Sequence, residues 1–236
     1  MTTSTSKPKE HGRLFRGPMV RAILEGRKTE TRRPIEPQPW HIESQAPVGT
    51  WCWSPKRQAV GLVPPELYAY DHDIWVAYPN YRPHLERFSP VRPGDRLWVR
   101  ETFTYITLAE NEWTGAADQR RRPDGVPVAM LYRADAEAEG WQIPAAWTPS
   151  IHMPRWASRI VLDLVDVRAA RLHDMGEADA VREGISMREA TLRCESPIAL
   201  FRELWDSLYT DPALAREANR WVWVYEWSPY QEVTSE

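Results

Sequence analysis

The stretch "ASRIVLDLVDVRAARL" at residues 157–172 is the strongest strand signal in the chain. β-Branched and leucine side chains dominate it, and such residues suit the pleated, half-buried surface of a sheet. Further along, "GEADAVREGI" (176–185) predicts a short helix, acidic in its first turn and ending at a glycine. "PIALFRELWDSLY" (197–209) carries apolar residues at helical spacing, and "RWVWVYEW" (220–227) predicts a closing strand.

Before this strand, "GPMVRAILEG" (17–26) predicts another short helix. Its proline suits the first helical position, and Gly26 suits a left-handed stop. The following "TETRRPI" (29–35) is expected to leave the helix in extended form.

Two further strands are expected in the middle of the chain. "VRPGDRLWVRETFTYI" (91–106) predicts a turn and then a strand with Leu97 and Val99 on one face, and "VAMLYRA" (128–134) predicts another strand. A few short strands around two or three short helices predict a single α+β domain built on a small barrel.

The domain organisation follows from composition. Residues 1–12 are polar and are expected to form a disordered tail, so the domain would span 13–230. Residues 34–95 hold 11 of the 21 prolines and show no sustained periodicity. Such an insertion is either a lid or binding loop, or a decoration on a smaller fold.

Charge and cysteine content exclude several classes of protein. The net charge of −3 does not suit a protein that lives on long nucleic acid, whose affinity comes from neutralising phosphates. Two cysteines without a His/Cys cluster indicate neither a zinc site nor a disulfide framework, so we expect no metal and no cofactor. The polar N-terminal segment and the absence of a long apolar run predict a cytoplasmic protein without membrane contact.

The ordered series "GRKTETRR", "PGDRLWVRETF", "SIHMPRWASRI", "EADAVREG" and "WVWVYEW" resembles the ASCH domain family, and most closely its larger phage and prophage members. The resemblance covers roughly residues 13–228. It implies a PUA-like β-barrel with flanking short helices and long irregular insertions. Some small ASCH proteins remove the acetyl group from N(4)-acetylcytidine, whereas others are described as RNA-binding modules or ribonucleases.

In the amidohydrolases of that family, the catalytic group is a lysine, a threonine three residues later, and a glutamate late in the chain. The resemblance carries these roles to Lys28, Thr31 and Glu183, with Arg33 as a substrate-binding residue. Arginine cannot be deprotonated in a protein, whereas a partly buried lysine can lose its proton and act as a base. Because strand side chains alternate, this chemistry requires Lys28 to sit in the turn after Gly26 and not in the strand.

Four more residues are candidates for binding a pyrimidine nucleoside. Glu101 could accept hydrogen bonds from the base, although a pair with Arg159 or Arg100 explains it equally well. His152, Arg155 and Trp156 combine a donor, a cation and a flat ring, which suits recognition of a base and its sugar. A purely structural role for the tryptophan remains open.

The resemblance thus implies a metal-independent hydrolase that cleaves the exocyclic amide of an N(4)-acylated cytidine or cytosine. The alternatives are an RNA- or modified-base-binding module without catalysis, and a ribonuclease. The expected partner is a small nucleoside or base, with RNA as the alternative. We also expect the loop from Trp40 to Trp53, together with Trp156, to wall a pocket for acyl groups larger than acetyl.

Overall fold

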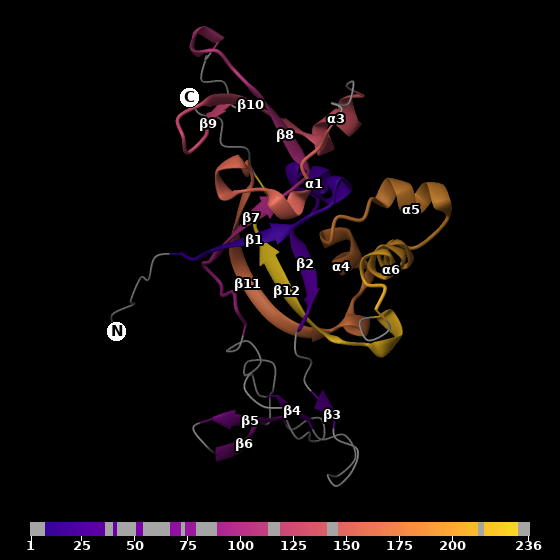
Figure 1. Ribbon diagram of the computed structural model, residues 1–236. Helices are drawn as coiled ribbons and strands as arrows, with labels where there is room; N and C mark the ends of the chain where they lie inside the picture. The colour runs from indigo at the N-terminus through magenta and orange to yellow at the C-terminus, as the bar shows by residue number, and fades with distance from the viewer. Residues whose placement is uncertain are drawn as a thin grey trace. The chain divides into compact units, whose positions relative to one another are not determined.

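The computed structural model describes residues 8–35, 40–41, 51–53, 67–71, 74–78, 89–112, 119–140, 146–211 and 215–230. They form short helices and three sheets, which confirms the predicted α+β class (Figure 1). The chain divides into two compact units. The first comprises Met1–Thr29, Gly94–Leu164 and Trp227–Glu236, and the second comprises Glu30–Pro93 and Val165–Glu226. A single domain over 13–230 stays a prediction.

In the first unit, the predicted strand after the Pro-Gly turn is confirmed as β7 (Arg96–Arg100). Leu97 and Val99 are its buried residues, as the alternation requires. β7 pairs in parallel with β1 (Glu10–Leu14) and antiparallel with the first residues of β11 (Val161–Arg171). These ladder hydrogen bonds stabilise β1. The strand begins at Glu10, inside the tail that the sequence predicts over residues 1–12.

The predicted N-terminal helix is confirmed as α1 (Gly17–Leu24), with its proline in the first turn. Val20, Ala22 and Ile23 form the buried face. Gly26 has φ +71°, a conformation that costs a glycine little because it has no Cβ. The helix therefore ends where the sequence predicts, and the chain turns there.

A second sheet of the first unit has the order β8-β10-β9. These strands are β8 (Phe103–Thr107), β9 (Gln119–Arg121) and β10 (Pro127–Tyr132), and α3 (Arg133–Glu139) follows the last of them. 3₁₀ turns lie at Glu110–Glu112 (η1), Ser150–His152 (η2) and Arg155–Ala157 (η3). The core on this sheet consists of Phe103, Val128, Met130, Tyr132, Met153 and Ala157.

In the second unit, the rest of β11 is followed in strand order by β12 (Trp221–Trp227) and then by β2 (Glu30–Pro34). β2 stands last in this order and pairs antiparallel with β12. Both long strands that the sequence predicts near the C-terminus are thus confirmed.

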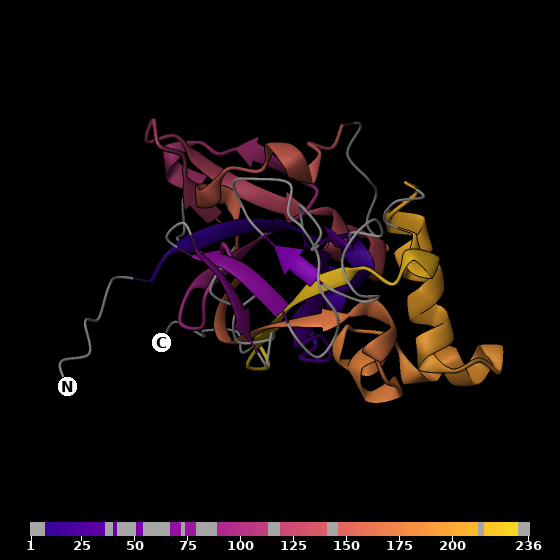
Figure 2. The same ribbon diagram turned by 90° about the horizontal axis from the view of Figure 1, so that it is seen from below.

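Three helices of the second unit gather on one side of β2 and β12, as Figures 1 and 2 both show. They are α4 (Glu177–Arg182), α5 (Met187–Arg193) and α6 (Pro197–Leu208). 3₁₀ turns precede α4 at Leu172–Asp174 (η4) and β12 at Arg216–Ala218 (η5). Leu200, Phe201 and Trp205 of α6 pack in one core cluster with Val222 and Val224 of β12. The helical spacing of apolar residues therefore correctly predicts that Phe201 and Trp205 are buried, whereas Leu208, at the same spacing, is exposed.

The proline-rich segment contains four strands that the sequence did not predict: β3 (Trp40–His41), β4 (Trp51–Trp53), β5 (Leu67–Asp71) and β6 (Ile74–Tyr78), in the sheet order β3-β4-β5-β6. The remainder of residues 36–88 lies outside the described residues. None of the sheets in the described part closes into a barrel, so the small PUA-like barrel stays a prediction. Within the described ranges, no helix has the length and apolar character needed to span a bilayer.

Candidate functional site

Lys28 lies in the segment that joins α1 to β2. After Gly26 turns the chain, the backbone N–H of Lys28 donates to the carbonyl of Ala22 at 2.9 Å. The residue is only 2% exposed, and its ammonium lies 6.0 Å from the centre of the Phe15 ring. Its carbonyl accepts a hydrogen bond from the indole N–H of Trp227 at 3.0 Å. Lys28 thus occupies the turn position that the expected chemistry requires.

Thr31 is buried on β2, opposite Tyr225 of β12. Because side chains alternate along a strand, Thr31 shares one face of β2 with the half-buried Arg33. Glu30 and Arg32 share the other face, and both are buried. The two faces of this short strand therefore carry different sets of polar groups.

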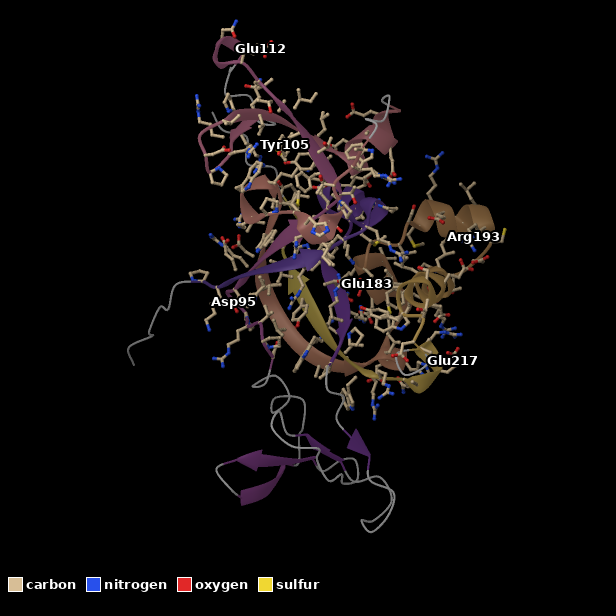
Figure 3. All side chains as sticks on the ribbon, viewed as in Figure 1. Asp95, Tyr105, Glu112, Glu183, Arg193 and Glu217 are labelled. Carbon is tan, nitrogen blue, oxygen red and sulfur yellow. The ribbon has the colours of Figure 1, made fainter. Side chains whose placement is uncertain are left out.

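Glu183 directly follows α4 and is 4% exposed. In Figure 3 it lies beside β2, away from outer side chains of the same unit such as Arg193. Its Oε1 accepts the backbone N–H of Arg32 at 2.5 Å and the Arg32 guanidinium at 3.4 Å. A residue 151 positions away is thereby fixed to the residue that directly follows Thr31.

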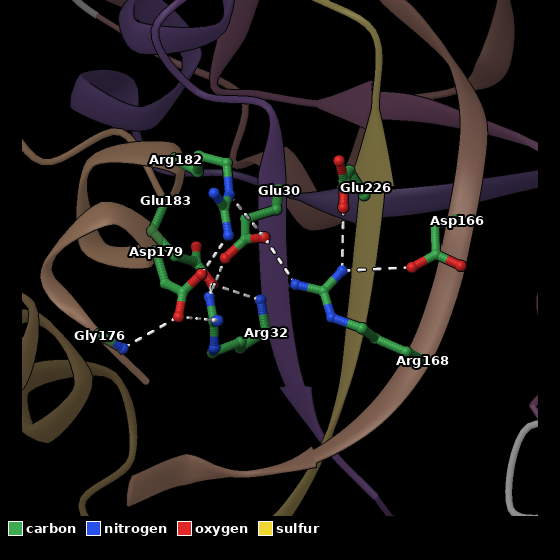
Figure 4. Close-up of polar contacts among 9 residues, drawn as sticks. All are labelled: Glu30, Arg32, Asp166, Arg168, Gly176, Asp179, Arg182, Glu183 and Glu226. Atoms are coloured by element: carbon green, nitrogen blue, oxygen red, sulfur yellow. Dashed lines mark hydrogen bonds and ion pairs between the residues drawn. The ribbon is translucent and has the colours of Figure 1, made fainter. Parts of the chain in front are cut away.

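Glu30, which is fully buried, connects three elements of the second unit (Figure 4). One of its oxygens accepts from Arg32 on the same strand. The other accepts from Arg168 of β11 at 3.0 Å and from Arg182 of α4 at 3.2 Å. A buried carboxylate persists only when it is paired and hydrogen-bonded in this way.

More carboxylates surround these guanidiniums. Arg168 donates to Glu226 at 2.9 Å and to Asp166 at 3.3 Å. Burial lowers the pKa of Arg168, but hydrogen bonds to Glu30, Glu226 and Asp166 outweigh burial, and the net effect raises that pKa. Arg168 is therefore a permanent cation in this network.

Asp179 of α4 supports the same network from the helix side. It pairs with Arg182, lies 3.6 Å from the Arg32 guanidinium, and accepts the backbone N–H of Gly176 at 2.9 Å. We call the set Glu30, Arg32, Asp166, Arg168, Asp179, Arg182, Glu183 and Glu226 the arginine–carboxylate network. It lies entirely in the second unit.

The expected catalytic residues are distributed over both units. Lys28 belongs to the first unit, and Thr31, Glu183 and Arg33 belong to the second. All three residues with expected catalytic roles are buried, which is uncommon for lysine and glutamate unless they are paired.

Glu101 is paired inside the first unit. The alternative interpretation, in which Glu101 forms an ion pair with Arg159, therefore describes it. The Arg159 guanidinium donates to its two carboxylate oxygens at 3.0 and 3.1 Å, and also to both oxygens of Asp135 at 2.6 and 2.9 Å. Arg159 also stacks 4.0 Å from the centre of the Tyr132 ring. Burial raises the pKa of Glu101, although Arg159 opposes this. Burial lowers the pKa of Arg159, but the bonds to Asp135 and Glu101 more than reverse it.

The three residues of "HMPRW" take different places in the first unit. His152 is exposed, and Arg155 is exposed and paired with Glu10 at 2.7 Å. Trp156 packs against the core of the β8-β10-β9 sheet and meets Tyr105 edge to face at 6.2 Å. A structural role therefore accounts for Trp156, while His152 remains accessible.

The sequence reasoning missed Glu30, Arg32, Arg168 and Arg182. A signal for the first two exists, because "ETR" places opposite charges two residues apart and hence on one face of a strand. The partners on β11 and α4 carry no such local signal.

No group of three or more metal-ligating side chains lies in the part of the chain that the structure describes. The expected pocket wall from Trp40 to Trp53 lies outside the residues whose side chains are described. Comparison with known proteins found no matching family model, no matching curated protein and no matching solved structure. The residues themselves therefore carry the functional argument.

Proposed function

We propose that this protein is an amidohydrolase that cleaves the exocyclic amide of N(4)-acylated cytidine or cytosine, with Thr31 as nucleophile and Lys28 as base. The same proposal includes the resemblance to the ASCH family and the PUA-like barrel that it implies. It also includes the kinship with phage and prophage proteins and the cytoplasmic location. The net charge of −3 supports a small substrate over a long polyanion.

One observation carries the proposal. Glu183 binds the backbone N–H of Arg32 at 2.5 Å, so the late glutamate of the motif lies next to the nucleophile's own strand segment. The resemblance implies such a proximity, and the ion pair of Glu183 with the Arg32 guanidinium stabilises it. The turn position and burial of Lys28 are consistent with it.

The proposed reaction has two steps. In the first, the Thr31 hydroxyl oxygen attacks the amide carbonyl carbon while Lys28 takes the hydroxyl proton. When the C–N bond breaks, Lys28 returns this proton to the leaving N4 nitrogen, which releases cytidine and leaves an acyl ester on Thr31. Arg33, or backbone N–H groups near Gly26, stabilise the negative oxygen of the tetrahedral intermediate.

In the second step, water attacks the ester carbonyl. Lys28 or Glu183 accepts a proton from that water, and the proton then passes to the Thr31 oxygen as the ester bond breaks. The products are a carboxylic acid and the regenerated enzyme, so no metal and no cofactor is consumed. A carboxylate held by two N–H donors, as Glu183 is, keeps a fixed orientation for this role.

The test is a spectrophotometric assay of the purified protein on N(4)-acetylcytidine and N(4)-benzoylcytidine, with Thr31→Val as a control of nearly equal volume. We expect conversion to cytidine by the wild type and a loss of at least about 10²-fold in the variant. An inactive wild type, or a fully active Thr31→Val protein, would contradict the proposal. Tight binding of the nucleoside without turnover would point to a base-binding module instead.

A further inference from the structure

We infer that Arg32 is a positioning residue for Glu183, a role that rests on the proposed function and extends it to the other face of β2. Arg32 supplies two donors to a single oxygen of Glu183, one from its backbone and one from its guanidinium (Figure 4). The backbone donor sets where the carboxylate lies. The guanidinium adds a charge-assisted contact that restricts its rotation.

Arg32 can do this only because its own guanidinium is held in place. It is 4% exposed, and it donates to Glu30 and lies 3.6 Å from Asp179. Glu30 is in turn held by Arg168 and Arg182 from two other elements. The Arg32 guanidinium is thus held between Glu30 and Glu183, and its side chain does not rotate towards solvent.

A guanidinium is required for this geometry. Its Nη1 donates to both Glu30 and Glu183 while its Nη2 lies 3.6 Å from Asp179, whereas an ammonium has a single nitrogen and acts as a compact point charge. Lysine at this position would keep the charge, but its single nitrogen could not face Glu30, Glu183 and Asp179 with the same geometry. Glu183 would then keep its backbone contact and lose its second restraint.

The test compares Arg32→Lys with Arg168→Lys. Both variants replace an arginine that donates to Glu30, and Arg32 also donates to Glu183. We expect Arg32→Lys to lower kcat on N(4)-acetylcytidine by about 10²-fold at unchanged KM, since misplacement of a catalytic group slows the reaction without weakening substrate binding. Arg168→Lys keeps a cation beside Glu30 and leaves both donors from Arg32 to Glu183 in place, so its kcat should fall much less than that of Arg32→Lys.

Melting curves accompany both variants, because a general loss of structure would lower kcat in both. Arg32→Gln, which keeps an uncharged NH₂ donor group, is the second variant should Arg32→Lys fail to fold, and we expect the same fall in kcat. An active wild type whose kcat falls equally in the Arg32 and Arg168 variants would overturn the positioning role alone. A wild type without amidohydrolase activity would overturn the proposed function, and the positioning role with it.

Discussion

Lys28 is the side chain whose chemistry can be tested most directly. A guanidinium keeps its proton at any working pH, so we expect Lys28→Arg to lose activity by about 10²–10⁴-fold. Since base and nucleophile act as one unit, the losses from Lys28→Arg and Thr31→Val should not add in the double variant. Activity assays on the two single variants and the double variant measure this.

Because Lys28 is almost fully buried, a larger side chain there could also disturb packing. Lys28→Met, which is neutral and similar in length, is the control for this effect. It should also be inactive, and its melting curve shows whether the fold survives. Near-full activity of a folded Lys28→Arg protein would remove lysine from the mechanism.

Glu101 predicts a pH dependence of stability. Its pKa is raised in the folded state, chiefly by burial, so the folded protein holds this proton to higher pH than the unfolded chain does. The stabilisation is complete below the unfolded glutamate pKa of about 4.3 and is lost as pH rises through the higher folded value. Glu101→Gln removes this titration.

The measurement is urea unfolding of wild type and Glu101→Gln at a series of pH values. The free energy of unfolding of the wild type should fall relative to that of the variant as pH rises from about 4 towards neutrality. A constant difference between the two proteins would show that Arg159 cancels the effect of burial.

The end of α1 is set by a local sequence signal. Gly26, with φ +71°, ends α1 and delivers Lys28 to its turn. Gly26→Ala should destabilise the protein by about 1 kcal/mol, because alanine is strained at positive φ. Urea unfolding measures this, with Gly176→Ala as control: that glycine has φ −100°, and an added Cβ would meet only an ordinary contact at 3.8 Å.

Elements with periodic or punctuated sequences were predicted correctly, as α1, α6, β11 and β12 show. β1 was missed because "EHGRL" is polar and becomes a strand only through its parallel pairing with β7. The turn before Lys28 could be predicted from a single residue, Gly26. The arginine–carboxylate network could not be predicted from the sequence. Its members come from β2, β11 and α4, and no local pattern tells which of many arginines meets which carboxylate.

For the molecule as a whole, Glu30 is expected to matter more than any exposed ion pair. It is fully buried and binds arginines from three elements, so Glu30→Gln leaves the buried Arg32 and the partly exposed Arg168 and Arg182 without their shared anion. We expect a loss of about 3–5 kcal/mol in the free energy of unfolding. Glu226→Gln, at the partly exposed rim of the network, should cost at most about 1 kcal/mol.

Urea unfolding of the two glutamine variants gives this comparison directly. Equal, small losses would mean that the arginines of the network find other partners when Glu30 is neutralised. The comparison uses the same chemical change at both positions, so burial is the main difference between them.

The contact between Glu183 and the backbone of Arg32 also bears on solubility. β2 stands last in its strand order, and strands in that position carry unpaired N–H groups that attract strands of other molecules. The carboxylate of Glu183 accepts a hydrogen bond from one of these N–H groups. Its negative charge at this position discourages intermolecular β-pairing. Loss of this carboxylate would therefore free the N–H group of Arg32 and expose an edge that strands of other molecules can pair with, even in molecules that remain folded.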